Sequence, residues 1–291
     1  MTAAVEVEAP TGASALGMHN DLSNEAYHAD KTSLSSSGAR KLLPPSCPAK
    51  FRYEHDNPQP ASKTFDHGNA AHKKVLGNGP ELILVDHPAW TTNAAKAEVA
   101  AARAQGGIPL KRHEIDMVNA MAAAIRKHPL AAALLDPAFG APEQSGFWID
   151  GPTGIRRRVR FDWLPSIQGG RLIIPDYKTS ADASSEAMQK DIDKYGYNCQ
   201  AAWYLDGVEA LSLADAAAFV FVCQEKEPPY LVTVAEPDGL SMHLARELNR
   251  RAIDLYARCV AEDRWPGYSD EVELIPLPGW KENAYKWELN Q

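Results

Sequence analysis

The sequence lacks the closely spaced cysteines that disulfide frameworks, zinc sites and iron–sulfur clusters require. Its four cysteines are scattered, with no C-x-x-C pair, at Cys47, Cys199, Cys223 and Cys259. This distribution is typical of reduced, mostly buried thiols. We therefore expect a protein of a reducing compartment that holds no metal through cysteine.

The chain also lacks an excess of positive charge and any long apolar run. Its 38 acidic and 30 basic residues give a net charge of −8, so a DNA-binding role would need a local basic surface. No segment approaches the roughly 20 apolar residues of a membrane span. The first residues, MTAAVEVEAPTGASALG, show no basic region or apolar core of a secretory signal. We expect a cytoplasmic protein without membrane contact.

Two enzymatic motifs are missing as well. No G-x-x-x-x-G-K-[ST] occurs, which gives no support to an ATP-driven motor. The segment HEID at residues 113–116 begins like a zinc-protease motif, but position 117 is not the second histidine. The chain is therefore not expected to be a zinc protease.

The remaining pattern predicts one mixed domain. With 291 residues and 45% hydrophobic content, the chain can build a sizeable core. We expect a flexible tail over residues 1–18 and a single domain over residues 19–291. Helices are predicted over residues 38–43, 46–56 and 64–77, with Gly77 as a C-cap, and across Thr92–Leu135 with a break at GGIP.

From Glu143 onward the hydrophobic period changes to that of strands. Residues 143–150, 155–165 and 171–178 are short strand-like runs separated by turn residues, which predicts an antiparallel meander. A helical region over 183–208, strands over 216–224 and 230–236, and a long helix over 239–262 follow. The predicted fold class is α+β (mixed α/β), with a central mixed β-sheet that contains the meander and is flanked by helices.

The segment LIIPDYKTS, residues 172–180, carries the chemistry. Asp176 and Lys178 are two residues apart in a strand and share one face. A hairpin centred on Gly169 sets Asp162 opposite Asp176, and opposed carboxylates repel unless a cation lies between them. Hard oxygen ligands favour Mg²⁺ or Mn²⁺. With Lys178 to neutralise charge on a phosphate, the pattern predicts metal-assisted phosphodiester hydrolysis.

A purely structural interpretation of the same residues stays open. An Asp-x-Lys pair at a strand end is usually a solvated ion pair of little energetic value. A single β-bulge would also move Asp162 out of register with Asp176.

Two further groups of polar residues lie near this pattern. Arg156, Arg158 and Arg160 share a strand face with Asp162, so they could form the local basic surface or equally be its salt-bridge partners. Gln200 and Tyr204 stand at i and i+4 on one helix face, where they could also serve helix packing alone.

Five segments in this order resemble the PD-(D/E)xK nuclease superfamily, in the RecE type (exodeoxyribonuclease VIII-like) of phage and prophage exonuclease. They are GNAAHKKVLG, PEQSGFWID, RRRVRFDWLP, IIPDYKTS and YGYNCQAAWYLDG, and the resemblance covers about residues 20 to 265. It implies a PD-(D/E)xK nuclease core. In that pattern His72 and Glu143 correspond to auxiliary metal-site residues.

The remaining motif positions follow from the same resemblance. Asp162 and Asp176 correspond to the metal-binding acids and Lys178 to the catalytic lysine. Gln200 and Tyr204 match the family's Q-x-x-x-Y helix, which lies beside the active site and the DNA.

The activity that the resemblance implies is a Mg²⁺-dependent (or Mn²⁺-dependent) exonuclease. It would degrade one strand of linear double-stranded DNA from the 5′ end and leave a 3′ overhang for a RecT-type annealing protein. Relatives form ring-shaped homo-oligomers, whose basic residues can face inward while the outside stays acidic. Such a protein is encoded by a phage or prophage and works in the bacterial cytosol.

Three alternatives remain at this point. A Cas4- or AddB-like nuclease would need one early and three late cysteines for its iron–sulfur cluster, and only Cys259 stands late in the sequence. A DNA-end-binding scaffold could keep the fold without catalysis. Paired carboxylates could act as acid and base on a sugar, although this leaves Lys178 and the basic strand without a role.

Overall fold

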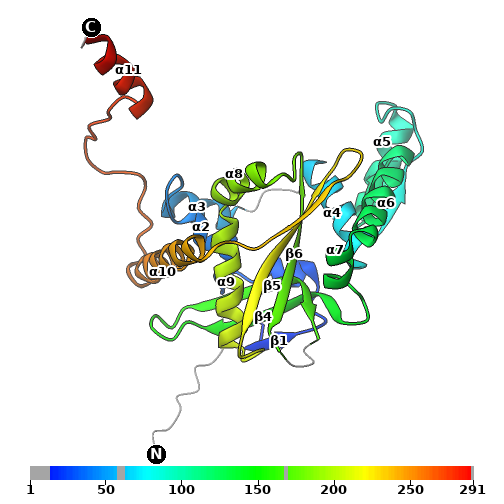
Figure 1. Cartoon of the computed structure of the whole chain (residues 1–291), viewed down its shortest axis with the longest axis horizontal. Coiled ribbons are helices and arrows are strands. Elements are labelled where there is room, and N and C mark those ends of the chain that lie inside the picture. Colours follow the sequence, from blue (N-terminus) through cyan, green and yellow to red (C-terminus); the bar gives the residue numbers. More distant parts are fainter. Residues whose placement is uncertain (1–13, 58–62, 167–169, 290–291) are drawn as a thin grey trace, which may run out of the picture.

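The computed structural model describes residues 14–57, 63–166 and 170–289 of the chain, and side chains are not described at 63–66, 284, 288 and 289. Helices and strands mix along the chain, and the predicted α+β class is confirmed (Figure 1). Residues 1–13 of the predicted tail lie outside the described residues. Its last two residues begin β1 (Gly17–His19), which pairs antiparallel with β4.

The helices predicted over residues 38–43, 46–56 and 64–77 are present, with bounds shifted by at most two residues, and a further short helix precedes them. They are α1 (Asn24–Ala29), α2 (Ser36–Lys41), α3 (Pro48–Asp56) and α4 (Lys63–Leu76). The Ser35 hydroxyl accepts a hydrogen bond from the Gly38 N–H and caps α2. Gly77, at φ 80°, follows α4 in the left-handed conformation that a C-cap glycine adopts most easily.

A helical lobe flanks one side of the strands (Figure 1). It contains β2 (Leu82–Leu84), α5 (Asn93–Ala104), β3 (Ile108–Leu110), α6 (Arg112–Lys127) and α7 (Pro129–Leu134). The predicted break at GGIP is real, because Gly106 turns at φ 74° and β3 pairs in parallel with β2. Buried side chains of α6, such as Met121 and Ile125, join Tyr177 and Val222 of the central strands in one hydrophobic cluster.

The central strands form two three-stranded sheets. β4 (Gly140–Ile149) and β5 (Arg156–Pro165) pair antiparallel, as the sequence predicts, in the order β1-β4-β5. β6 (Leu172–Ser180) pairs in parallel with β7 (Ala217–Glu225), which pairs antiparallel with β8 (Val232–Ala235).

The predicted antiparallel pairing of the second and third strands is therefore wrong. In the described residues, β6 forms its backbone hydrogen bonds with β7 instead of β5. The two strands pair in parallel because the helical crossover between them brings β7 back in the same direction. Gly169, the predicted centre of the hairpin, lies outside the described residues. Strands β5 and β6 nevertheless lie side by side (Figure 1). Asp162 therefore still comes close to Asp176, since its Oδ2 accepts a hydrogen bond from the N–H of the next residue, Tyr177.

The larger core lies between the strands and the C-terminal helices. α8 (Ser185–Tyr195), α9 (Tyr197–Ala210) and α10 (Gly239–Glu262) lie on the side opposite the helical lobe, whereas α11 (Gly279–Leu289) stands away from the strands (Figure 1). Trp203 of α9 is fully buried among Phe161, Phe219 and Phe221 of the strands. Within the described residues, no helix combines the length and apolar character needed to cross a membrane.

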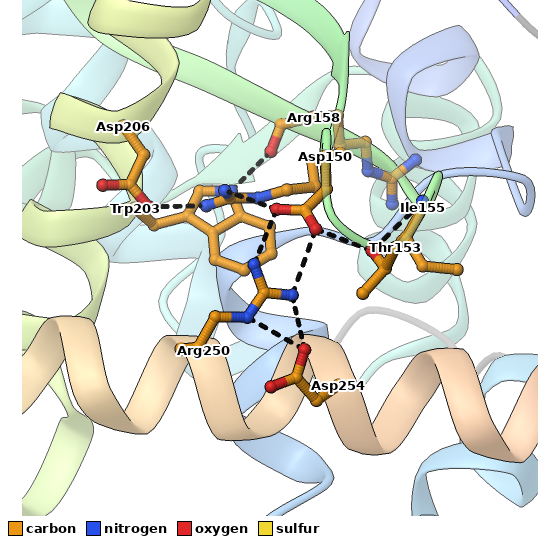
Figure 2. Close-up of polar contacts among 9 residues, drawn as sticks. Asp150, Thr153, Ile155, Arg158, Trp203, Asp206, Arg250 and Asp254 are labelled. Carbon is orange, nitrogen blue, oxygen red and sulfur yellow. Dashed lines mark hydrogen bonds and ion pairs between the residues drawn. The ribbon is translucent and has the colours of Figure 1, made fainter.

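A buried ion-pair network fastens the β4–β5 hairpin to α9 and α10 (Figure 2). Arg250 donates bidentate hydrogen bonds to the Asp150 carboxylate, both at 3.0 Å. Arg157 lies 3.6 Å from Asp150, donates to Asp206 at 2.9 Å and stacks 4.0 Å from the Trp203 ring centre. Because Arg157 is on β5 only five residues before Asp162, this network fixes the strand that carries a candidate catalytic acid.

Neutralising Asp150 should weaken the fold. An Asp150→Asn change leaves the buried Arg157 without one of its two carboxylate partners, and breaking a buried pair costs about 3 kcal/mol. Urea denaturation should show this loss in the free energy of unfolding. Asp86→Asn, in the exposed pair with Arg112, is the matched control and should change little; equal losses in both variants would contradict this role of the network.

Candidate active site

Strand β6 holds Asp176 and Lys178 on one face, as their spacing predicts. Asp176 is 1% exposed, and its Oδ2 forms an ion pair with Lys178 Nζ. Its Oδ1 accepts a hydrogen bond of 2.7 Å from Gln200 Nε2 on α9. The carboxylate is therefore held from its own strand and from the helix that packs on it.

The backbone of Tyr177 binds two of the predicted residues, Asp162 and His72. Its N–H donates to Asp162 Oδ2 at 3.2 Å, and its carbonyl accepts a hydrogen bond of 2.9 Å from His72 Nε2. His72 Nε2 also lies 3.6 Å from Asp162 Oδ2. The peptide unit before Tyr177 thus holds Asp162 beside Asp176, and the peptide unit after it holds His72 beside Lys178.

Glu143 reaches the same place through an irregularity in β4. Pro142 pairs with Trp163 and Gln144 with Phe161, which leaves Glu143 opposite Asp162. Glu143 has φ 57°, a left-handed conformation that costs free energy for a residue other than glycine. Its carboxylate forms an ion pair with Arg160.

Burial and the neighbouring charges shift the pKa values of Asp176 and Lys178. Burial raises the pKa of Asp176 to about 6, Lys178 opposes this shift, and the negative charge of Asp162 adds to it. Burial alone would lower the pKa of Lys178, but Asp176 and Asp162 together outweigh burial and raise it. Lys178 is therefore a fixed ammonium group beside two carboxylates.

Tyr204 lies deeper on α9. Burial and the charge of Asp176 hold the pKa of its phenol well above the usual range, so it stays protonated. Its ring packs edge-on against Phe161 and Phe219, with centroids 5.5 and 5.4 Å away. Tyr204 thus combines the packing role with a place in the wall of the cavity described below.

Three of the four arginines of β5, the ones predicted as a basic surface, contact the N-terminal segment. Arg156 is buried and donates to the carbonyl of Ser14, and Arg158 donates to the carbonyls of Tyr27 and Asp30. Arg160 donates to the Leu22 carbonyl and the Ser145 hydroxyl besides pairing with Glu143. Each guanidinium therefore already binds protein atoms.

A cavity of about 1240 Å³ is lined by most of these residues, but Arg156, Asp176 and Lys178 are not among the described residues that line it. Of the predicted site residues, its walls include His72, Glu143, Arg158, Arg160, Asp162, Gln200 and Tyr204. The sequence analysis missed the opposite wall, which consists of residues 20–25, 27, 28, 35–37, 40 and 41, and it missed Tyr195 and Tyr197. The serine cluster at 35–37 was a visible signal, but it indicates a helix cap equally well.

The donor set suits a hard divalent cation. In the described part of the chain, no group of three or more His, Cys, Asp or Glu side chains is arranged to hold a metal ion. Mg²⁺, however, is commonly bound by one or two carboxylates together with water and substrate oxygens. Asp162 and Asp176 supply two. Burial raises the pKa of Asp176 and the charge of Asp162 adds to that rise, so a cation between the two carboxylates would relieve their repulsion.

Comparison with known proteins places the chain in one family. The family model described as "PDDEXK-like domain of unknown function (DUF3799)" matches residues 35–278, which include every predicted site residue. No curated protein matches the sequence. The fold is similar to the crystal structure of a "Putative exonuclease" from Eubacterium rectale, with a TM-score of 0.59, 13% identity, and coverage of 90% of this chain and 98% of that one. The chain therefore belongs to the PDDEXK-like family DUF3799 and, with it, to the PD-(D/E)xK nuclease superfamily.

Proposed function

We propose that this protein is a divalent-metal-dependent DNA exonuclease that hydrolyses phosphodiester bonds of linear double-stranded DNA. The observation that carries the proposal is the convergence of Asp162, Asp176, Lys178 and Gln200 beside one large cavity. Its volume of about 1240 Å³ can hold a nucleotide. Its lining residue Gln200 donates a hydrogen bond to Asp176, and Lys178 Nζ lies 5.3 Å from the ring centre of another lining residue, Tyr197.

The residues divide the work of phosphodiester hydrolysis between them. Asp162 and Asp176 would hold Mg²⁺ or Mn²⁺, which supplies Lewis acidity at the phosphoryl oxygen when bound. Gln200 fixes the orientation of the Asp176 carboxylate through its hydrogen bond. Lys178, kept protonated by its carboxylate neighbours, can stabilise the negative charge that grows on the phosphate in the transition state.

Glu143 and His72 complete the surroundings of this pair. Glu143 faces Asp162 across the β4–β5 ladder, and His72 reaches the site from α4. We propose that both assist in binding the metal, directly or through water. Arg158 and Arg160, which line the cavity, are proposed to lend positive charge to the path of the DNA backbone.

The finer assignments rest on the resemblance to RecE-type exonucleases. We propose digestion in the 5′→3′ direction, 3′ overhangs for a RecT-type annealing protein, a ring-shaped homo-oligomer, and action in the cytosol of a bacterial host of a phage or prophage. The name of the structural neighbour from Eubacterium rectale supports the exonuclease part of this proposal.

Digestion of a linear duplex labelled at either the 5′ or the 3′ end tests the activity and its polarity. With Mg²⁺, the 5′ label should be released as mononucleotides, and EDTA should stop the release. Lys178→Ala should lower the rate by about 10²–10³-fold, the range for loss of one charge-stabilising group. Lys190→Ala, which removes an exposed lysine of α8, is the matched control. Retention of end binding without cleavage in any divalent metal would favour the scaffold alternative.

Metal binding itself can be measured without DNA. A divalent ion that binds only the folded protein should raise Tm, with about 2.7 kcal/mol of added stability at a hundredfold excess over Kd. Asp162→Asn and Asp176→Asn should each reduce this shift strongly. If both variants showed the same metal-induced rise in Tm as wild type, the ion would bind elsewhere.

The pH dependence of metal binding follows from the raised pKa of Asp176. Its carboxyl titrates near pH 6, and only the deprotonated form binds a cation. Lowering the pH from about 7 to about 5 should therefore weaken Mg²⁺ binding roughly tenfold. Thermal-shift titrations at the two pH values measure this, and unchanged affinity would contradict the assignment of Asp176 as a ligand.

A further inference from the structure

Three aromatic rings form a row from the edge of the cavity into the core. The Tyr195 and Tyr197 ring centroids are 5.5 Å apart with an interplanar angle of 31°, and those of Tyr197 and Phe221 are 5.4 Å apart at 34°. Phe221 is fully buried, whereas Tyr195 is 42% exposed. The row therefore presents one tyrosine at its outer end.

This row lies beside the proposed catalytic lysine. Lys178 Nζ is 5.3 Å from the centre of the Tyr197 ring. Tyr195 and Tyr197 line the same cavity as Asp162 and Gln200. A ligand that contacts Tyr195 is thus in the space that leads to the carboxylates.

The junction between α8 and α9 keeps both tyrosines on this wall. Gly196, between them, is left-handed at φ 65°. A Cβ added there would lie 2.5 Å from Arg40 Cδ, so the stem of Arg40 packs closely against the glycine. Both features restrict residue 196 to glycine and fix the direction in which the two tyrosines leave the chain.

Core packing accounts for Tyr197 and Phe221 but not for Tyr195. The exposed ring of Tyr195 has Lys194 Nζ 4.9 Å from its centre, so it combines an aromatic surface with a mobile cation. An aromatic face beside a lysine is the combination that binds single-stranded nucleic acid, by base stacking together with a phosphate contact.

We propose that Tyr195 is a stacking platform for an unpaired nucleobase at the DNA end, with Lys194 near the adjoining phosphate. This inference rests on the proposed nuclease function and adds a substrate feature to it. The enzyme engages an end whose terminal base has left the duplex, and Tyr195 holds that base while the phosphodiester lies near Asp162 and Lys178. Tyr195 is in this account a positioning residue for the substrate.

The test pairs a change in the protein with a change in the DNA. Two linear duplexes are compared, one with an intact terminal nucleotide on the digested strand and one with an abasic nucleotide there. In wild type, loss of the base should lower kcat/KM by about 5- to 100-fold, the range for one stacked base. In Tyr195→Ala, both DNAs should be cleaved at the same reduced rate, because the stacking partner is already gone.

Further variants separate stacking from structure. Tyr195→Phe and Tyr195→Trp should restore the preference for the intact base, whereas Tyr195→Leu should not. Tyr53→Ala removes an exposed tyrosine of α3, 65% exposed, and should leave the preference unchanged. Equilibrium binding of the same two DNAs in EDTA gives a second readout that needs no cleavage.

The outcomes distinguish the two proposals. If wild type cleaves DNA, but the ratio of kcat/KM for the intact and abasic DNAs is the same in wild type and Tyr195→Ala, the stacking proposal alone is overturned. Wild type that does not cleave in any divalent metal would overturn the proposed function, and the binding ratio in EDTA would then decide whether Tyr195 stacks a base.

Discussion

One buried carboxylate, that of Asp176, constrains the rest of the site. Asp176 is nearly inaccessible, and its burial raises its pKa to about 6. The charge of Lys178 offsets part of this rise, and the like charge of Asp162 adds to it. Such an arrangement lowers stability unless the surrounding structure holds it. The hydrogen bonds from Gln200 to Asp176 and from the Tyr177 N–H to Asp162 are the means by which the fold does so.

The support for Tyr177 extends across the sheet. Its hydroxyl donates to Gln224 Oε1 on β7 at 2.6 Å, and Gln224 Nε2 donates to the Met121 carbonyl of α6 at 2.9 Å. These groups are buried, where a satisfied polar network fixes a single geometry. The helical lobe thus helps to position the peptide units that hold Asp162 and His72. On strand β5, Arg158 and Arg160 hold the N-terminal segment, which forms part of the cavity wall.

The sequence predicted which residues lie close together at the site better than it predicted the strand pairing. Asp176 and Lys178 share a face because strand geometry requires it, and that needs no tertiary information. The neighbourhood of Asp162 and Asp176 was expected from an antiparallel hairpin, yet β6 pairs in parallel with β7. The prediction assumed that a short turn makes consecutive strands pair. Instead, the helical crossover from 185 to 210 lets β6 pair with β7. The contacts of Arg156, Arg158 and Arg160 could not be predicted either. Their positions show that they share a strand face, but not that residues 14–30 will cover that face. Tyr195 gave no signal, because its role depends on a cavity that distant segments build.

Diffraction from crystals soaked in Mn²⁺ tests the central claim most directly, because anomalous scattering locates the ion without reference to activity. The account predicts Mn²⁺ bound by carboxylate oxygens of Asp162 and Asp176, at about 2.0–2.3 Å as expected for a small hard cation. Mn²⁺ found only at other sites, with the Asp176–Lys178 ion pair intact, would contradict it.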